Sequence, residues 1–471
     1  MRTYSFAEIG SDSLYEYLYK CIKKDILKGI LHSGEKLPSK RSFAKNLGIS
    51  VITVENAYEN LMSEGYIYSI PKKGFYVTDL KKHITAETSL TKSETVSVTN
   101  KEENYIFDFS SNQTPSALFP FAVWTKLIRE VLRNNQEGLM INPPSGGLFL
   151  LRKAIAGHLK DFRDIHVLPE QIIIGAGTEY LYGLLIQLFG IEKRYAVENP
   201  GYQKISKIYK SHSVTCDFIS MDENGIKVKE LEDKKIDIVH ISPSHHFPTG
   251  IVTPISRRYE LLGWVSKKKT RYIIEDDYDS ELRLSGRPIP TLQSIDVSDK
   301  VIYMNTFTKT LSSTIRISYM VLPRPLLQRY FETLSFYSCT VSNFEQYTLA
   351  KFIENGYFEK HINRMRNHYQ HKRDILINAI NESPLKNFVK ILNADAGLHF
   401  LMKIDINCSD QEFISLLKKH GVKLTSLSEY YIENQENIEH IFVINYSSIN
   451  RENISKAVEI IYKCCNSCLS C

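Results

Sequence analysis

Five short apolar runs along the middle of the chain each precede a turn rich in glycine, hydroxyl or charged residues. They cover positions 172–174, 195–197, 236–241, 272–274 and 301–304, with helix-like patterns between them. Alternation of short buried strands with helices is typical of an α/β domain with a largely parallel sheet. The carboxyl ends of parallel strands lie at one edge of a sheet, so we expect the polar turns to meet there and to bind a ligand.

The turn after the last run contains Lys309, which lies among hydroxyl residues and is followed seven positions later by Arg316. A lysine that leaves a buried strand into such a turn is placed to form a Schiff base with an aldehyde cofactor. The hydroxyls and the arginine can hold a phosphate, the arginine through two parallel hydrogen bonds. The alternative is a solvated loop lysine beside a structural arginine.

Three earlier turns supply other groups that pyridoxal phosphate needs. Gly177 and Thr178 stand at a predicted helix N-terminus, where backbone N–H groups and a hydroxyl can bind a phosphate. Tyr202 follows a Pro-Gly turn and can stack on an aromatic ring. Asp276 or Asp277, at a strand end, can pair with a pyridinium nitrogen. Each feature alone has a structural explanation, but their order ahead of the lysine favours a site for pyridoxal phosphate.

From about residue 108 to the C-terminus, these motifs resemble those of the fold-type-I aminotransferases. The resemblance implies that Lys309 is the Schiff-base lysine, that Asp276 pairs with the pyridine nitrogen and that Tyr278 donates to the ring hydroxyl. It also implies that Tyr202 stacks on the ring, and that the chain forms a homodimer, a domain-swapped form included. The residues implied to hold the phosphate are Gly177, Thr178, Thr306, Thr308 and Arg316.

The first 80 residues predict a small winged helix-turn-helix. Apolar residues recur at helical spacing from Ser13 to Ile30. Ser39 and Ser50 are predicted N-caps of two further short helices, and residues 66–78 predict a two-stranded wing around a Pro-Lys-Lys-Gly turn. Four basic residues between positions 36 and 45 suit contacts with DNA phosphates. A winged helix that binds protein is the alternative.

This segment resembles the GntR-type winged helix from Leu37 to Tyr66. Val51 and Ile52 stand where that family commonly has an arginine and a polar residue. Apolar side chains can contact thymine methyl groups but cannot form the arginine pair with guanine, so we do not expect the operator to be read through that pair. The residues that the resemblance and the basic cluster place on double-stranded DNA are Ser39, Lys40, Arg41, Thr53, Lys72, Lys73 and Gly74.

Residues 81–104 are rich in Ser, Thr, Glu and Lys and predict a flexible linker. It separates a DNA-binding domain at 1–80 from an effector domain at 105–471, in keeping with a length of 471 residues. The chain shows neither an apolar run of about 18 residues nor a secretory leader pattern, so no membrane partner and a cytoplasmic location are expected. The net charge of +6 permits nucleic-acid binding without requiring it.

Four of the eight cysteines lie within the last eight residues. The spacing of Cys465, Cys468 and Cys471 can suit a metal ion, but no histidine or second cysteine pair accompanies it. We expect reduced thiols and no metal site.

A GntR-type winged helix joined to an aminotransferase-like domain resembles the MocR subgroup of bacterial transcription regulators. Two departures from catalytic aminotransferases bear on turnover. Phe247 stands where those enzymes usually carry an asparagine, and Val443 where they usually carry the arginine that binds the substrate carboxylate. Loss of that clamp removes much of the orientation that transamination needs. We therefore expect no significant turnover and assign no catalytic residue.

The same loss favours an effector that needs no carboxylate anchor. A PdxR-like regulator of vitamin B6 synthesis genes, which responds to pyridoxal phosphate itself, meets that condition. Lys204, His245 and His246 are further candidate effector contacts. Three alternatives stay open: a MocR regulator that senses an amino acid or amine as an external aldimine, an active aminotransferase with an accessory DNA-binding domain, and a scaffold with a vestigial cofactor site.

Overall fold

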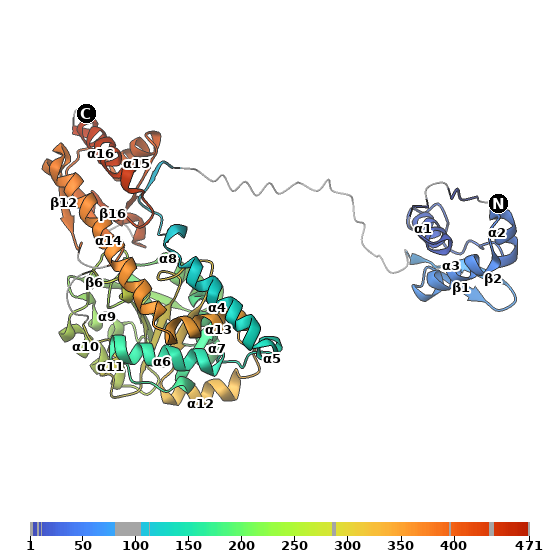
Figure 1. Cartoon of the computed structure of the whole chain (residues 1–471), viewed down its shortest axis with the longest axis horizontal. Coiled ribbons are helices and arrows are strands. Elements are labelled where there is room, and N and C mark those ends of the chain that lie inside the picture. The colour runs from blue at the N-terminus through green and yellow to red at the C-terminus, as the bar shows by residue number, and fades with distance from the viewer. Residues whose placement is uncertain are drawn as a thin grey trace. The chain divides into compact units, whose positions relative to one another are not determined.

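The computed structural model describes residues 3–6, 9–10, 12–80, 105–112, 114–284, 289–394, 397–432 and 438–469. These residues form two compact units, one on each side of positions 81–104 (Figure 1). The predicted linker at 81–104 and Cys471 lie outside the described residues. Each unit is described by itself.

The N-terminal unit consists of three helices and a hairpin. The helices are α1 (Leu14–Leu27), α2 (Lys40–Leu47) and α3 (Val51–Ser63), and the hairpin strands are β1 (Ile67–Ile70) and β2 (Gly74–Val77). Both predicted caps are confirmed, because the Ser39 hydroxyl accepts from the backbone N–H of Ser42 at 3.2 Å and the Ser50 hydroxyl from that of Thr53 at 3.1 Å. The core forms around Tyr58, which is fully buried. This is the predicted winged helix-turn-helix.

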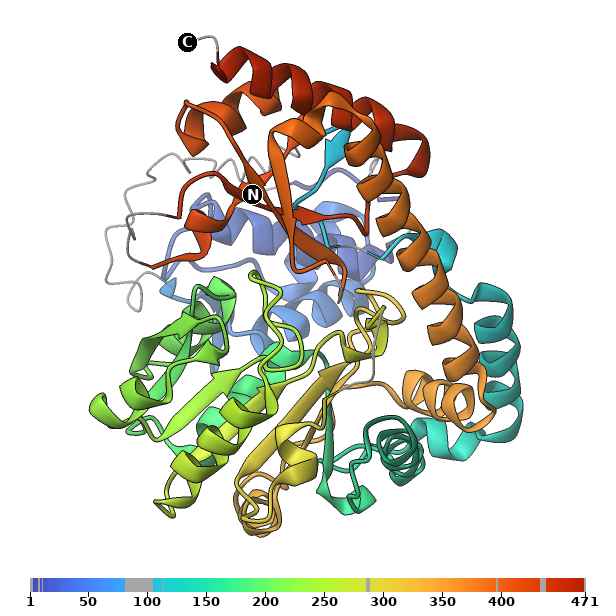
Figure 2. The same ribbon diagram turned by 90° about the vertical axis from the view of Figure 1, so that its left-hand side faces the viewer.

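The larger unit is built on an eight-stranded sheet in the order β4-β11-β10-β9-β8-β5-β6-β7 (Figure 2). The run from β10 to β6 is parallel, whereas β11 pairs antiparallel with β10 and β4, and β7 pairs antiparallel with β6. The predicted parallel sheet is therefore confirmed in the centre and mixed at the edges. The strands are β4 (Ile172–Gly175), β5 (Tyr195–Asn199), β6 (Cys216–Asp222), β7 (Gly225–Ile226), β8 (Ile238–Ile241), β9 (Tyr272–Asp276), β10 (Val301–Thr306) and β11 (Ser318–Val321).

Helices cover both faces of this sheet, which explains why its central strands are apolar throughout rather than alternating. Ile172 and Ile174 belong to the core cluster beneath α6 and α13, while Ile173 between them belongs to the cluster beneath α7. The helices of this part are α4 (Phe121–Asn134), α5 (Gln136–Met140), α6 (Phe149–Arg163), α7 (Thr178–Phe189), α8 (Gln203–Ser211), α9 (Val228–Asp233), α10 (Ile255–Ser266), α11 (Leu292–Ile295), α12 (Arg324–Thr333) and α13 (Asn343–Glu354).

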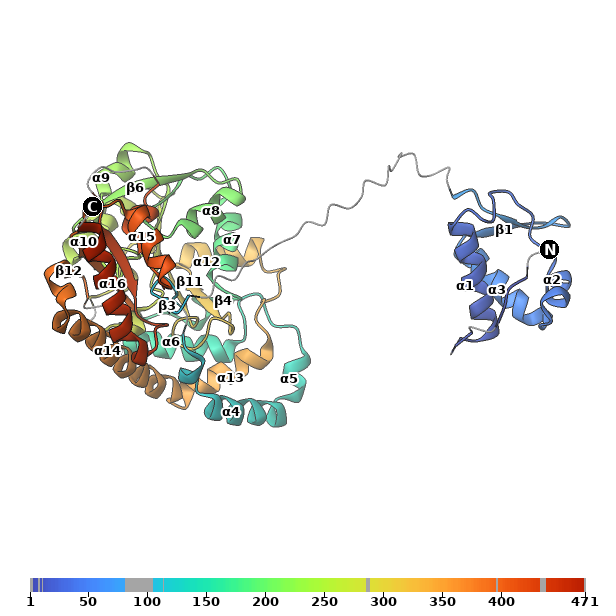
Figure 3. The same cartoon turned by 90° about the horizontal axis from the view of Figure 1, so that it is seen from above.

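The long helix α14 (Tyr357–Glu382) leads to a smaller C-terminal part with its own core. An antiparallel sheet in the order β12-β13-β16-β15 packs there with α15 (Asp410–Lys419) and α16 (Ile454–Leu469), and α14 runs beside α16 (Figure 3). None of the described helices is long and apolar enough to cross a membrane. The strands are β12 (Val389–Leu392), β13 (His399–Ile404), β15 (Thr425–Ser426) and β16 (Ile441–Asn445), with β3 (Phe107–Asp108) paired to β14 (Val422–Lys423).

Candidate effector site and DNA-reading surface

A cavity of about 430 Å³ lies at the carboxyl ends of the central strands, and Tyr430 from the C-terminal part completes its wall. The turns that follow β4, β5, β9 and β10 all contribute to it, so the structure brings together eight of the nine residues predicted around pyridoxal phosphate. The ninth, Gly177, contacts one of the eight. The eight are Thr178, Tyr202, Asp276, Tyr278, Thr306, Thr308, Lys309 and Arg316.

Lys309 lies at this cavity with its ammonium group largely removed from water. Its Nζ donates a hydrogen bond to the backbone carbonyl of Asn112 at 3.0 Å. Burial lowers the pKa of Lys309 from its usual value to about 8, although the charge of Asp279 opposes that effect. A lysine with such a pKa has a substantial neutral fraction near neutral pH, which is the form that attacks an aldehyde.

Asp276, the last residue of β9, offers one free carboxylate oxygen to the cavity. Its Oδ2 accepts a hydrogen bond from the Tyr182 hydroxyl at 2.8 Å and lies 3.5 Å from Nε2 of His240. Its Oδ1 is buried and has no hydrogen-bond partner among the residues that the structure describes. Buried polar atoms are nearly always satisfied, so this orphan oxygen fits a group such as a protonated ring nitrogen.

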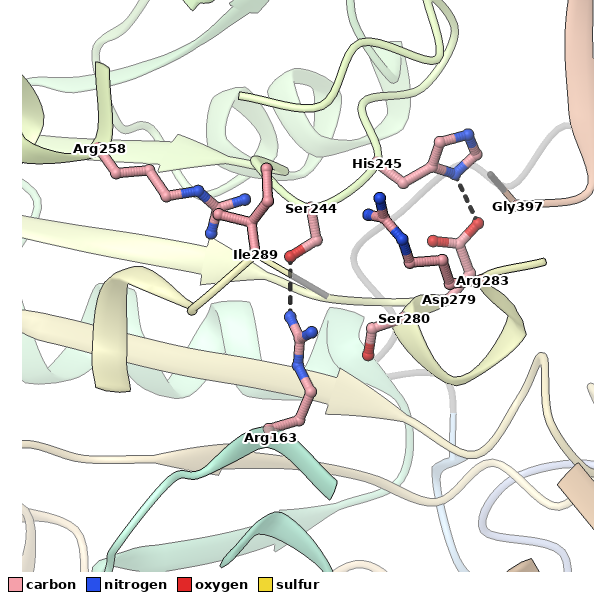
Figure 4. A pocket seen from close by; sticks show the side chains of 9 residues that line it. All are labelled: Arg163, Ser244, His245, Arg258, Asp279, Ser280, Arg283, Ile289 and Gly397. Atoms are coloured by element: carbon pink, nitrogen blue, oxygen red, sulfur yellow. Dashed lines mark hydrogen bonds and ion pairs between the residues drawn. The ribbon is translucent and has the colours of Figure 1, made fainter. Parts of the chain in front are cut away.

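Asp277 points away from the cavity, into a polar layer behind it. Its carboxylate pairs with Arg163 at 2.8 Å, and Arg163 also donates to Ser244 at 2.9 Å. Close by, the His245 ring meets Asp279 at 2.8 Å (Figure 4). The cavity between these side chains is only about 10 Å³, the size of one water molecule. Of the two acids that the sequence offered, only Asp276 lines the large cavity.

Of the three candidate effector contacts, only Lys204 lies at the large cavity. The expectation that His245 and His246 face an effector is wrong, because both are buried behind the cavity wall. The His246 ring instead bonds to Thr249, with Nδ1 2.7 Å from its hydroxyl, and burial lowers the pKa of His246 to about 3.

Hydroxyl and guanidinium groups gather at one end of the cavity. The hydroxyl of Thr306 lies 2.8 Å from that of Thr308, and both face the cavity mouth beside Arg316. Gly177 adopts a φ of 97° and lies so close to the Arg316 guanidinium that a Cβ at this position would overlap it. Thr178 is the first residue of α7, whose N-terminal N–H groups add partial positive charge. These donors fit a phosphate.

The opposite wall is apolar. Phe247 makes edge-to-face contacts with Tyr202 and Tyr430, at centroid distances of 6.1 and 5.2 Å. It also packs against a small core cluster that contains Val443, whose exposure is 3%, and the neighbouring strand residue Leu401. The position at which catalytic relatives are expected to hold a substrate carboxylate is thus part of a hydrophobic core.

The predicted DNA-reading residues lie on the N-terminal unit with differing freedom. Four of them, Ser39, Arg41, Lys72 and Lys73, are exposed, and Gly74 is half-buried. The ammonium of Lys40, in contrast, pairs with Glu55 at 2.6 Å and lies over the Phe75 ring. The hydroxyl of Thr53 lies 2.8 Å from that of Ser50.

The start of the recognition helix α3 presents apolar side chains to solvent. Val51 is 41% exposed and Ile52 is 67% exposed. They occupy the first turn of the helix, the part that meets base edges when a recognition helix enters the major groove. This surface is therefore available to thymine methyl groups.

Comparison with known proteins agrees with this two-part organisation. Residues 14–77 match the bacterial regulatory proteins of the gntR family, and residues 104–461 match aminotransferase class I and II. The HTH-type transcriptional regulator YdeL of Bacillus subtilis is 39% identical over 420 residues, which cover 89% of this chain and 90% of YdeL. Two further relatives at 28% identity are the regulatory protein MocR of Rhizobium meliloti, with 89% and 88% covered, and the pyridoxine biosynthesis transcriptional regulator PdxR of Corynebacterium glutamicum, with 89% of each covered. The chain belongs to the MocR subgroup of GntR-type regulators.

The effector unit of this MocR-type chain has the aminotransferase fold. Kynurenine aminotransferase of Pyrococcus horikoshii superposes with a TM-score of 0.68 over 78% of this chain and 92% of the enzyme, at 22% sequence identity. At that identity the likeness concerns the fold alone. The mixed sheet and its C-terminal companion are thus the expected scaffold of a MocR effector domain.

Sequence reasoning missed several groups around the cavity of this MocR-type chain. Tyr182 and His240, which approach Asp276, carry no local motif. Glu198 lines the cavity and accepts from the N–H of Ser242 at 2.9 Å, and its burial raises its pKa to about 8, so it is largely protonated at neutral pH. Glu179 also lines the cavity, and its place directly after the Gly-Thr pair is the one signal that could have revealed it.

Proposed function

We propose that this MocR-type regulator binds pyridoxal phosphate and that the bound molecule controls its affinity for DNA. The genes that it regulates would then include those of vitamin B6 synthesis. The observation that carries the proposal is the contrast across one cavity. A half-buried lysine, an orphan carboxylate oxygen and a cluster of phosphate donors face one side, and an apolar core that contains Val443 closes the other.

Pyridoxal phosphate supplies an aldehyde that a neutral amine can capture covalently. Lys309 is the residue that would capture it, and Asp276 would hold the ring nitrogen through its free Oδ1. Tyr202 and Tyr278 line the same cavity beside the ring position. The phosphate would be held at the N-terminus of α7 by Thr178, Thr306, Thr308 and Arg316, with Gly177 leaving room for the guanidinium.

Significant aminotransferase activity is not part of the proposal. Transamination requires the amino acid to be oriented by its carboxylate, usually through a bidentate arginine. Val443 and Phe247 offer no such donor. Val443 instead lies in an apolar cluster with Leu401, and Phe247 packs against that cluster. Amino acids would therefore be held too loosely for efficient turnover.

The PdxR relative, whose name refers to pyridoxine biosynthesis, supports the choice of pyridoxal phosphate as the effector.

Control of DNA binding would arise by linkage. Suppose that the chain has two arrangements and that both pyridoxal phosphate and DNA bind one arrangement better than the other. Pyridoxal phosphate then changes the affinity for DNA, and DNA changes the affinity for pyridoxal phosphate by the same factor. A homodimer would present two reading units to two half-sites of an operator. Coupling of this kind typically changes affinity by about 5- to 150-fold.

The test is binding of the full chain to the DNA upstream of its own gene, with and without pyridoxal phosphate. We expect a shift of at least about fivefold in affinity, and borohydride reduction should leave the pyridoxyl group on Lys309 in a mass-spectrometric digest. An unchanged binding curve would contradict the proposal. A shift that requires an added amine or amino acid would favour an amine sensor, and rapid conversion of the cofactor to its amine form would favour an enzyme.

A further inference from the structure

A carboxylate of the chain itself lies among the cations at the phosphate end of the cavity. Glu179 is the second residue of α7 and lines the cavity mouth. Its side chain forms an ion pair with Lys204 of α8, and its other oxygen lies 3.7 Å from Nη2 of Arg316. One carboxylate thus bridges two cations that line the cavity.

The charge balance of this cluster matters for a phosphate ligand. Arg316 and Lys204 contribute two positive charges and Glu179 removes one, so the cluster carries a net charge of +1. A phosphate monoester carries about −1.5 to −2 near neutral pH. Glu179 therefore both occupies donors that a phosphate needs and repels the phosphate once it has arrived.

We propose that Glu179 is a built-in competitor for the phosphate, which weakens the binding of pyridoxal phosphate and so sets the concentration at which this chain responds. The inference rests on the proposed function. A sensor must stay unsaturated over the range that it reports, whereas an enzyme gains by holding its cofactor permanently. The same cations with a neutral residue at position 179 would hold the phosphate more tightly.

The alternative is an ordinary surface ion pair that joins α7 to α8. All three side chains are about half exposed, and exposed pairs contribute only about 0–1 kcal/mol to stability. Such a pair would affect the folded state but would not discriminate between ligands with and without a phosphate. This difference makes the two interpretations separable.

The experiment compares pyridoxal phosphate with 5′-deoxypyridoxal, which keeps the aldehyde and the ring but has no phosphate. Capture by the full chain is titrated for wild type, Glu179→Gln, Lys204→Met and the double variant. Counted by charge, we expect pyridoxal phosphate affinity to rise about three- to tenfold in Glu179→Gln, to fall by a similar factor in Lys204→Met, and to return near wild type in the double variant. Affinity for 5′-deoxypyridoxal should stay level across the series, and the differences should shrink at high salt.

Glu130→Gln is the matched control, because Glu130 forms a similar pair with Lys351 at 2.7 Å and does not line this cavity. It should leave both affinities unchanged. The inference would be overturned if Glu179→Gln changed the affinity for both ligands equally, or if it did not raise the affinity for pyridoxal phosphate. Capture of pyridoxal phosphate by the wild type would still support the proposed function in that case. Absence of capture by every variant would overturn both.

Discussion

In both the N-terminal unit (the reading unit, residues up to 80) and the larger unit (the effector unit, residues from 105), apolar residues stand where related proteins are expected to carry an arginine. The exposure of these apolar residues differs between the two units. In the reading unit, Val51 and Ile52 stand where GntR-type relatives commonly have an arginine and a polar residue, and both are well exposed. In the effector unit, Val443 stands where aminotransferases usually hold an arginine, and it is 3% exposed within a core cluster.

This difference separates a change of specificity from a loss of it. An exposed apolar side chain at the start of α3 can contact a thymine methyl group but cannot donate a hydrogen bond to guanine. A buried apolar side chain such as that of Val443 packs within its own core and is not accessible to a ligand. We therefore propose that the N-terminal unit differs from its relatives in the bases that it recognises, whereas the effector cavity lacks a donor for a substrate carboxylate and keeps the groups that fit a cofactor.

The largest expected effect is on the cofactor side. Lys309→Ala removes the amine that we propose captures the aldehyde, and Lys204, which also lines this cavity, is paired with Glu179. Covalent labelling by pyridoxal phosphate should therefore disappear, and DNA binding should no longer respond to it. Lys309→Arg, which keeps the charge, should fail equally. Mass spectrometry after borohydride reduction and DNA titration provide the readouts. Retained labelling elsewhere in the cavity would show that the cofactor side has been assigned to the wrong residue.

Placing one substitution at both apolar positions tests the comparison directly. Val443→Arg buries an unpaired charge and should lower the free energy of unfolding of the effector unit by about 3–5 kcal/mol. Val51→Arg places the same side chain in solvent and should change the stability of the reading unit by less than about 1 kcal/mol. Urea denaturation, with each unit followed through its own transition, measures both. Similar losses at the two positions would remove the distinction.

The pH dependence of capture probes the burial of Lys309. Its pKa is lowered to about 8 by burial, so the neutral amine is lost about tenfold per pH unit below that value. We expect the initial rate of capture to rise with pH and to level off near pH 8, whereas an exposed lysine would continue to gain up to its usual pKa of 10.5. The same titration with N-acetyl-lysine is the reference. A profile that follows the reference would mean that the lysine is exposed in solution.

The smallest effect concerns the reading unit. An operator selected in vitro with the full chain should contain thymines that contact Val51 or Ile52, and replacing such a thymine by deoxyuridine removes one methyl group. Each lost contact should weaken binding by about fourfold, since one buried methyl contributes about 0.8 kcal/mol. The variant Val51→Ala with Ile52→Ala should bind both probes equally. Equal binding of the two probes by wild type would show that these side chains do not read methyl groups.

Local sequence signals were sufficient to predict the main helices and strands and the residues at the cavity that the motifs contain. Ser39 and Ser50 cap the helices for which they were predicted, because each cap hydrogen bond joins residues only three positions apart in the chain. Lys309 was placed at the cavity because a buried strand that ends in a polar turn must deliver that turn to the sheet edge. The apolar character of Val51, Ile52 and Val443 was likewise evident, but not whether each was exposed or buried.

The sequence by itself determined the order of strands and turns along the chain and the position of Lys309 in the turn after Thr306. The tertiary structure decided which neighbour in a pair serves the cavity. Asp276 faces it and Asp277 does not, because adjacent residues in an extended segment point to opposite sides. It also buried His245 and His246 and brought Glu179 to Lys204 from another helix. Side-chain burial and pairing across elements depend on packing between distant segments, and a linear pattern does not specify that packing.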